Sequence, residues 1–135
     1  MNSKFAAETS AGISYSYSYS TDKGMMYSMT CYFSKTKSWM KKEFMNPYIL
    51  KHEQGHFDIA EIFARKLDNA LKNYKVDFNT VKSDLKGIYT KIIDEKDAMN
   101  EQYDNETQHS IDTAKQREWN QKIETMISEG NNTAH

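Results

Sequence analysis

The hydrophobic pattern of this chain changes period once, near Pro47, and this change constrains the fold more than any other feature. Before it, large and small side chains alternate with period two from Ile13 to Tyr19 ("ISYSYSY"), which indicates a β-strand. After it, apolar residues recur at the spacing of an α-helix. Strands followed by helices predict an α+β fold, in which a small antiparallel sheet packs against helices.

The alternating part predicts an antiparallel hairpin. Ile13–Tyr19 and Met25–Phe33 both alternate, and the "STDKG" between them suits a tight connection. Two strands alone are marginally stable in water. We therefore expect a helix or a third strand to cover one face of the hairpin.

A long helix is predicted after the hairpin. Asn46 can cap it and Pro47 suits its first turn, so we expect it to extend from about Tyr48 to about Tyr74. Thr80 can cap a second helix, which has an apolar stripe. The stripe consists of Val81, Leu85, Ile88, Ile92 and Met99.

The apolar spacing of the second helix is interrupted at "YDNETQHS", residues 103–110, which is rich in short polar side chains that can hydrogen-bond to their own backbone. We expect a break in the helix there. The apolar spacing resumes with Trp119 and Ile123, and the Gly/Asn-rich residues 129–135 are expected to form a flexible tail.

Length, composition and charge limit the classes of protein to which this chain can belong. A length of 135 residues, with 38% hydrophobic and 27% charged residues, fits a single domain over 1–135. The net charge of -1, with lysines and arginines spread along the chain, argues against binding to nucleic acid or an anionic membrane. No apolar run is long enough to predict a transmembrane segment, and the first ten residues lack the apolar core of a signal peptide. A chain trimmed of an export signal would look the same.

The stretch "ILKHEQGHFDIAEIFARKL" carries the candidate chemistry. His52 and His56 lie about 40° apart around the helix, on the side of Ile59 and Phe63, so both should point inward. Two imidazoles at this spacing can bind one tetrahedral Zn2+. Glu53, next to that face, is expected to take a proton from a zinc-bound water. Gly55 leaves room between the histidines and predicts close approach by another element. A charged helix with two buried histidines and no metal is the alternative.

A catalytic zinc needs a third protein ligand. We expect His109, because imidazole suits zinc, and Glu106 is the alternative. His135 is expected to lie in the disordered tail. Tyr103 is a candidate to stabilise an oxyanion and Asp104 to orient an imidazole, with a core tyrosine and a helix cap as the respective alternatives.

Five blocks that occur in order resemble a bacterial family of unknown function whose members are described as predicted zinc-dependent proteases. The blocks are "AAETSAGISYSY", "KSWM", "ILKHEQGHFDIAEIFARKL", "YDNETQHS" and "QREW". The resemblance implies a zincin-like fold, zinc at His52, His56 and His109, a catalytic Glu53, and an extracytoplasmic location, periplasmic or secreted. Ser110 departs from the pattern, since a glycine is common there. The chain also starts close to the first block, and the resemblance therefore implies that an N-terminal strand of the pattern is missing.

These features together predict a zinc metallopeptidase that hydrolyses a peptide or protein substrate. The competing hypothesis is a binding or structural domain of the bacterial cell envelope, in which zinc only staples the core. A site closed by four protein ligands favours structure, and an open one favours catalysis.

Overall fold

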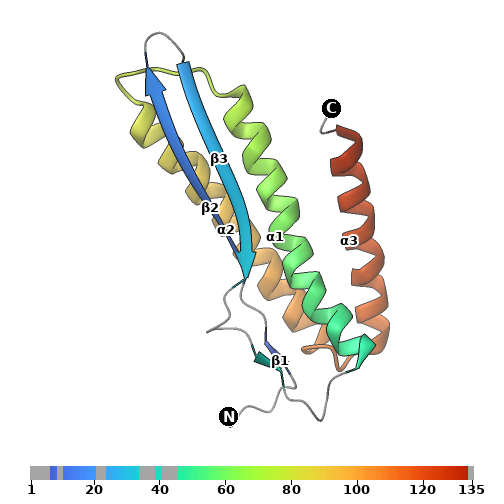
Figure 1. Ribbon diagram of the computed structural model, residues 1–135. Coiled ribbons are helices and arrows are strands. Elements are labelled where there is room, and N and C mark those ends of the chain that lie inside the picture. Colours follow the sequence, from blue (N-terminus) through green and yellow to red (C-terminus); the bar gives the residue numbers. More distant parts are fainter. Residues whose placement is uncertain (1–6, 9–10, 21–23, 34–38, 41–45, 134–135) are drawn as a thin grey trace.

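The computed structural model describes residues 7–8, 11–20, 24–33, 39–40 and 46–133 (Figure 1). These residues form an α+β fold, as the change of hydrophobic period predicts. The elements are β1 (Ala7–Glu8), β2 (Ala11–Ser20), β3 (Gly24–Phe33), β4 (Trp39–Met40), α1 (Pro47–Asn73), α2 (Val81–Thr107) and α3 (Thr113–Thr133).

The predicted hairpin is confirmed. β2 and β3 pair antiparallel, with Tyr17 opposite Tyr27 and Ser16 opposite Ser28. Tyr17 and Tyr27 pack against the core, whereas the two serines are exposed and their hydroxyls lie 2.9 Å apart across the strands. The period of two therefore divides the hairpin into a face toward the helices and a hydroxyl-rich outer face. β1 pairs separately with β4.

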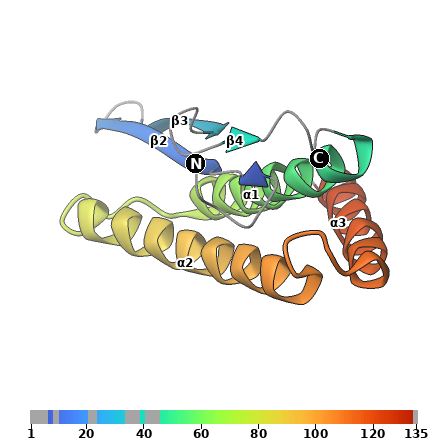
Figure 2. The same ribbon diagram turned by 90° about the horizontal axis from the view of Figure 1, so that it is seen from below.

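Helix α1 is the centre of the fold, and it contacts β2, β3, α2 and α3. The hairpin lies over one side of α1, α2 runs along another, and α3 packs beside it (Figures 1 and 2). The predicted start of this helix is confirmed, because the Asn46 side chain accepts a hydrogen bond from the Ile49 backbone N–H at 2.8 Å and Pro47 follows. Its buried apolar residues are Ile59, Ala60, Ile62, Phe63, Leu67 and Leu71.

The break after the second helix lies further along the chain than the sequence pattern predicts. α2 continues through the polar segment to Thr107, because Tyr103 and Thr107 extend its buried face. Thr80 takes the N-cap position, but its hydroxyl accepts no hydrogen bond from the helix backbone and donates instead to the Asp84 carboxylate at 2.8 Å.

The expected flexible tail is also shorter than predicted. Residues 129–133 belong to α3, since a glycine near a helix end costs only about 1 kcal/mol and no proline interrupts the chain there. His135, expected in this tail, lies outside the described residues.

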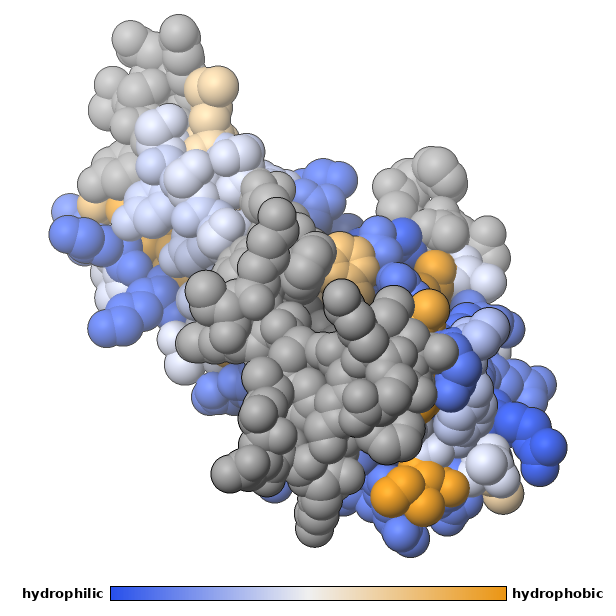
Figure 3. Space-filling model, turned by 60° about the horizontal axis from the view of Figure 1, so that its bottom comes forward, coloured by the Kyte–Doolittle hydropathy of each residue, from blue (hydrophilic) through white to orange (hydrophobic). Residues whose placement is uncertain are grey.

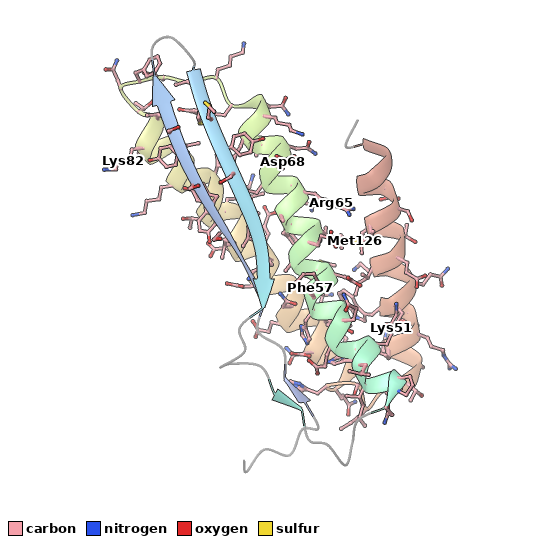
Figure 4. The ribbon with its side chains drawn as sticks, in the orientation of Figure 1. Lys51, Phe57, Arg65, Asp68, Lys82 and Met126 are labelled. Carbon is pink, nitrogen blue, oxygen red and sulfur yellow. The ribbon has the colours of Figure 1, made fainter. Side chains whose placement is uncertain are left out.

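Tyrosine hydroxyls attach the hairpin to the helices. Tyr27 of β3 donates to the Asp68 carboxylate of α1 at 2.7 Å, on the side of α1 toward the hairpin in Figure 4. Tyr89 of α2 donates to the backbone oxygen of Ile13 at 2.6 Å. The ring of Tyr15 also contacts that of Tyr89, with centroids 4.8 Å apart. Each strand thus has a polar attachment in addition to its apolar packing.

On the face that Figure 3 shows, the described surface is mainly hydrophilic, and its orange apolar areas are small and separate. A few large apolar side chains are exposed, which is common on protein surfaces. They include Met26, Leu50, Phe78 and Ile111. None of the described helices is long and apolar enough to cross a membrane.

We predict that Tyr27→Phe lowers the free energy of unfolding by about 1 kcal/mol at pH 7, because it removes the bond to Asp68. Burial and the Asp68 carboxylate raise the pKa of Tyr27 to about 12. Because the folded pKa lies above the unfolded value, this contribution is complete below about pH 10 and is lost as the pH rises toward 12. Urea unfolding of both proteins at pH 7 and pH 11 checks this. An unchanged difference between them at pH 11 would contradict it.

Candidate metal centre

Three ionisable side chains of α1 and α2 meet between the two helices, which run side by side in opposite directions (Figure 1). His52 and His56 of α1 are buried, and both point their Nε2 atoms at one carboxylate oxygen of Asp104 on α2. The distances to Oδ1 are 3.1 Å from His52 and 2.8 Å from His56. The inward orientation predicted for both histidines is confirmed.

The other ring nitrogen of each histidine contacts a side-chain amide oxygen. His52 Nδ1 lies 2.6 Å from Gln116 Oε1 on α3, and His56 Nδ1 lies 2.9 Å from Asn100 Oδ1 on α2. An amide oxygen can only accept a hydrogen bond, so both Nδ1 atoms donate. In the neutral imidazole this leaves a lone pair on Nε2, and both lone pairs point at the Asp104 oxygen.

Such a convergence of acceptors requires a positive charge, either a proton or a metal ion. Burial alone would raise the pKa of the Asp104 carboxyl, but hydrogen bonds from His52 and His56 and the charges of His56 and His109 hold it well below its usual range. Burial alone would lower the pKa of His56, but Asp104, Asn100 and Glu53 outweigh it and raise that pKa. The group formed by His52, His56 and Asp104 thus favours a cation.

The group fits a divalent metal ion. One ligand atom from each of His52, His56 and Asp104 lies within 4.8 Å of the other two. Ligand atoms around a tetrahedral zinc are about 3.3 Å apart, as follows from bond lengths of about 2.0 to 2.1 Å. Small side-chain movements would therefore bring all three atoms onto one ion. Asp104, which the sequence suggested as support for a ligand, belongs to this group itself.

Tyr103 fills the space under the histidines. It is fully buried, its ring stacks on that of His52 with centroids 4.7 Å apart, and its hydroxyl donates to the His52 backbone oxygen at 2.7 Å. The hydroxyl also accepts from Gln116 Nε2 at 2.9 Å. Burial raises the pKa of Tyr103. This is the position of a core tyrosine, the second of the two functions considered from the sequence.

Gly55 is the place where α1 and Tyr103 touch. A Cβ atom on Gly55 would lie 2.8 Å from Tyr103 Cζ and closer still to its hydroxyl oxygen. The close approach predicted from a glycine between the two histidines is therefore confirmed, and the approaching element is α2.

His109 lies beside the group, with Nδ1 3.7 Å from Asp104 Oδ1 and its side chain partly exposed. Three consecutive residues around it, Gln108, His109 and Ser110, have φ angles of 50°, 52° and 81°. Non-glycine residues rarely adopt this left-handed region, and doing so costs of order 1 to 3 kcal/mol each. The value at Ser110 explains why a glycine suits that position. The role of His109 as third ligand stays a prediction.

Bonds from neighbouring elements hold this strained turn in place. The Tyr48 hydroxyl donates to the Ser110 backbone oxygen, and the Asp112 backbone N–H donates to the Thr107 oxygen at 2.8 Å. The position of His109 next to Asp104 is thus fixed from both α1 and α2.

Glu53 and Glu106, the two glutamates that the sequence suggested for the site, lie in different surroundings. Glu53 is half-buried, and its charge contributes to the raised pKa values of His56 and Tyr103, so it lies within electrostatic reach of the group. Both carboxylate oxygens of Glu106 accept hydrogen bonds elsewhere, from Trp119 Nε1 at 3.2 Å and Gln102 Nε2 at 2.6 Å. Glu106, the alternative third ligand, lies outside the group of potential ligands.

Sequence analysis missed Asn100 and Gln116, which contact the outer nitrogens of the histidines. A signal for Asn100 exists, since Asn100 and Asp104 repeat the i, i+4 spacing of the two histidines on the facing helix. This signal was overlooked, because the helix break expected from Tyr103 onward removed Asp104 from the predicted helix. Gln116 carries no such signal, because its place depends on how α3 packs.

We predict opposite effects for alanine at two mid-helix glycines. Gly55→Ala should lower the free energy of unfolding by about 1 to 3 kcal/mol, because the new methyl group meets Tyr103. Gly87→Ala, where nothing lies within 4 Å of the added Cβ, should raise it by up to about 1 kcal/mol through helix propensity. Urea unfolding measures both, and equal effects would contradict the close contact.

Residues 33–110 match the model of a family described as "Bacterial protein of unknown function (DUF922)". This segment is more than half of the chain and contains both histidines of α1, Asp104 and His109, whereas α3 lies beyond it. No curated protein and no solved structure matches the chain. The chain therefore belongs to the bacterial family of unknown function DUF922.

Proposed function

We propose that this protein is a zinc-dependent metallopeptidase, with zincin-like chemistry centred on the α1 motif His52-Glu53-x-x-His56. One observation carries the proposal: both Nε2 atoms converge on Asp104 Oδ1 while both Nδ1 atoms are held by amide oxygens. Metal-binding histidines in proteins typically have such partners on the other ring nitrogen. Two merely buried histidines would also need hydrogen-bond partners, but they would not need both Nε2 atoms aimed at one carboxylate oxygen.

His52 and His56 would hold the metal, with Asp104 or His109 as the third ligand. Zinc bound there supplies a Lewis acid and lowers the pKa of a water molecule to about 7. Glu53 follows the first ligand directly on α1, and its charge already acts on His56. Glu53 accepts the proton of the attacking water and returns it to the leaving amine of a peptide substrate.

Tyr103 takes no part in proton transfer in this mechanism. Its hydroxyl is bonded to the His52 backbone oxygen and to Gln116, and its pKa is raised. Its contribution is to set the depth at which His52 lies between the helices.

An extracytoplasmic, periplasmic or secreted location belongs to the same proposal. It is supported by the resemblance to predicted bacterial proteases, as are the peptide substrate and the zincin-like fold. These three features rest on the resemblance, whereas the geometry of the metal centre supports the binding of a cation.

A second candidate function is a zinc-stapled domain without catalysis. It is favoured by the position of His109, whose Nδ1 is only 3.7 Å from Asp104 Oδ1. If His52, His56, Asp104 and His109 all bound one ion, the site would be closed and no position would remain for water. The number of protein ligands therefore decides between the two functions.

We predict that Glu53→Gln binds zinc as the wild type does but loses at least about 100-fold in peptide hydrolysis, because the general base is removed. His56→Ala should lose zinc binding. Elemental analysis and hydrolysis of a peptide library measure the two properties separately. Wild-type activity in Glu53→Gln would exclude Glu53 as the base, and zinc without hydrolysis in the wild type would favour the stapled domain.

We further predict that only one of Asp104→Ala and His109→Ala strongly weakens zinc binding if the site is open. If the site is closed, both variants should weaken zinc binding, because both side chains are then ligands. Zinc affinity is measured by competition with a chelator. Cobalt substitution gives the coordination number from its absorption spectrum. Unchanged affinity in both variants would contradict either assignment.

A further inference from the structure

Gln116 on α3 is a polar side chain with no exposed surface, and both its polar atoms are hydrogen-bonded. Its Oε1 lies 2.6 Å from His52 Nδ1, and its Nε2 donates to the Tyr103 hydroxyl and to Asn120 Oδ1, each at 2.9 Å. Burying an amide costs free energy unless such bonds compensate for the lost water. Removing His52 would take away the partner of Oε1, and removing Tyr103 or Asn120 would leave one N–H of Nε2 without its acceptor.

These bonds fix the proton on His52. Because both N–H groups of the Gln116 amide point away from His52, only its oxygen faces the imidazole. Nδ1 must then carry the proton of the neutral imidazole, whose lone pair lies on Nε2, the atom that faces Asp104. The orientation of one amide on α3 therefore determines which nitrogen of His52 is free to bind a cation.

We propose that Gln116 is a positioning residue of the metal centre, which holds His52 in the tautomer whose Nε2 can bind zinc. This inference rests on the metal-binding part of the proposed function. It adds α3 to the site, although α3 lies beyond the segment that matches the family model.

Packing of α3 gives Gln116 a fixed position. Trp119, one turn later, places its ring against that of Tyr103 with centroids 5.3 Å apart. Further along, the Arg65 guanidinium of α1 donates to the Ile127 backbone oxygen at 3.1 Å, and Figure 4 shows Arg65 and Met126 between α1 and α3. Contacts thus hold α3 against the other helices at two points beyond Gln116.

Three variants of the full chain test the role of Gln116. Gln116→Leu and Gln116→Glu both lose the two N–H donors, but only the glutamate keeps an acceptor for His52 Nδ1. Gln121→Leu makes the same change at an exposed position of α3 and is the control. Zinc affinity is measured by chelator competition, and urea unfolding of the metal-free proteins reports the cost to the fold.

Gln116→Leu should bind zinc about 10 to 100 times more weakly than the wild type, which is the usual effect of losing a partner of a metal-bound histidine. Gln116→Glu should bind as tightly as the wild type or more tightly, and Gln121→Leu should remain within twofold. Nitrogen NMR of the zinc-loaded wild type should show His52 protonated at Nδ1. A purely structural residue would instead give two Gln116 variants with reduced stability and equal zinc affinity.

Equal zinc affinity in Gln116→Leu and Gln116→Glu would overturn the inference while leaving the zinc site intact. A His52 protonated at Nε2 in the loaded protein would do the same. If the wild type bound no zinc, the metal centre itself would be wrong, and the inference would fail with it. A zinc-binding protein without hydrolysis would overturn only the peptidase activity.

Discussion

The contact between Gly55 and Tyr103 determines how closely α1 and α2 approach, and the metal centre depends on that distance. With any side chain at position 55 the tyrosine ring would have to move outward. The same ring stacks on His52 and meets His56 edge-on with centroids 4.9 Å apart. Asp104 follows Tyr103 directly on α2, so its carboxylate reaches both histidines only when the tyrosine lies in its place.

The interior has two chemically different halves. Toward the end of α1 and the start of α2 it is apolar, with Leu67, Leu71, Val81 and Leu85 almost without exposure. Around the start of α1 and the end of α2, imidazoles, amides and a phenol are buried together. No buried side-chain nitrogen or oxygen of the described residues lacks a hydrogen-bond partner. The polar half is therefore compatible with a stable fold, but each of its members depends on the others.

The sequence was sufficient to predict the features set by local rules. The hairpin follows from alternation, the start of α1 from Asn46 and Pro47, and the inward histidines from their register with Ile59 and Phe63. What it could not supply depends on pairing between helices. Asp104 was expected within a helix break, because a run of short polar residues resembles a loop, whereas burial of Tyr103 and Thr107 keeps the segment helical. Gln116 reaches His52 across 64 residues of sequence, and no periodicity indicates such a contact.

The place of Gln116 also bears on where this domain ends. The family model stops at residue 110, in the strained turn, yet the polar half of the interior is completed by side chains of α3. A fragment expressed to the family boundary would expose the ring of Tyr103 where Trp119 covers it, and it would give His52 Nδ1 to solvent. The folding unit and the unit of sequence similarity are therefore not the same length, and comparisons among family members gain from including the helix that follows the match.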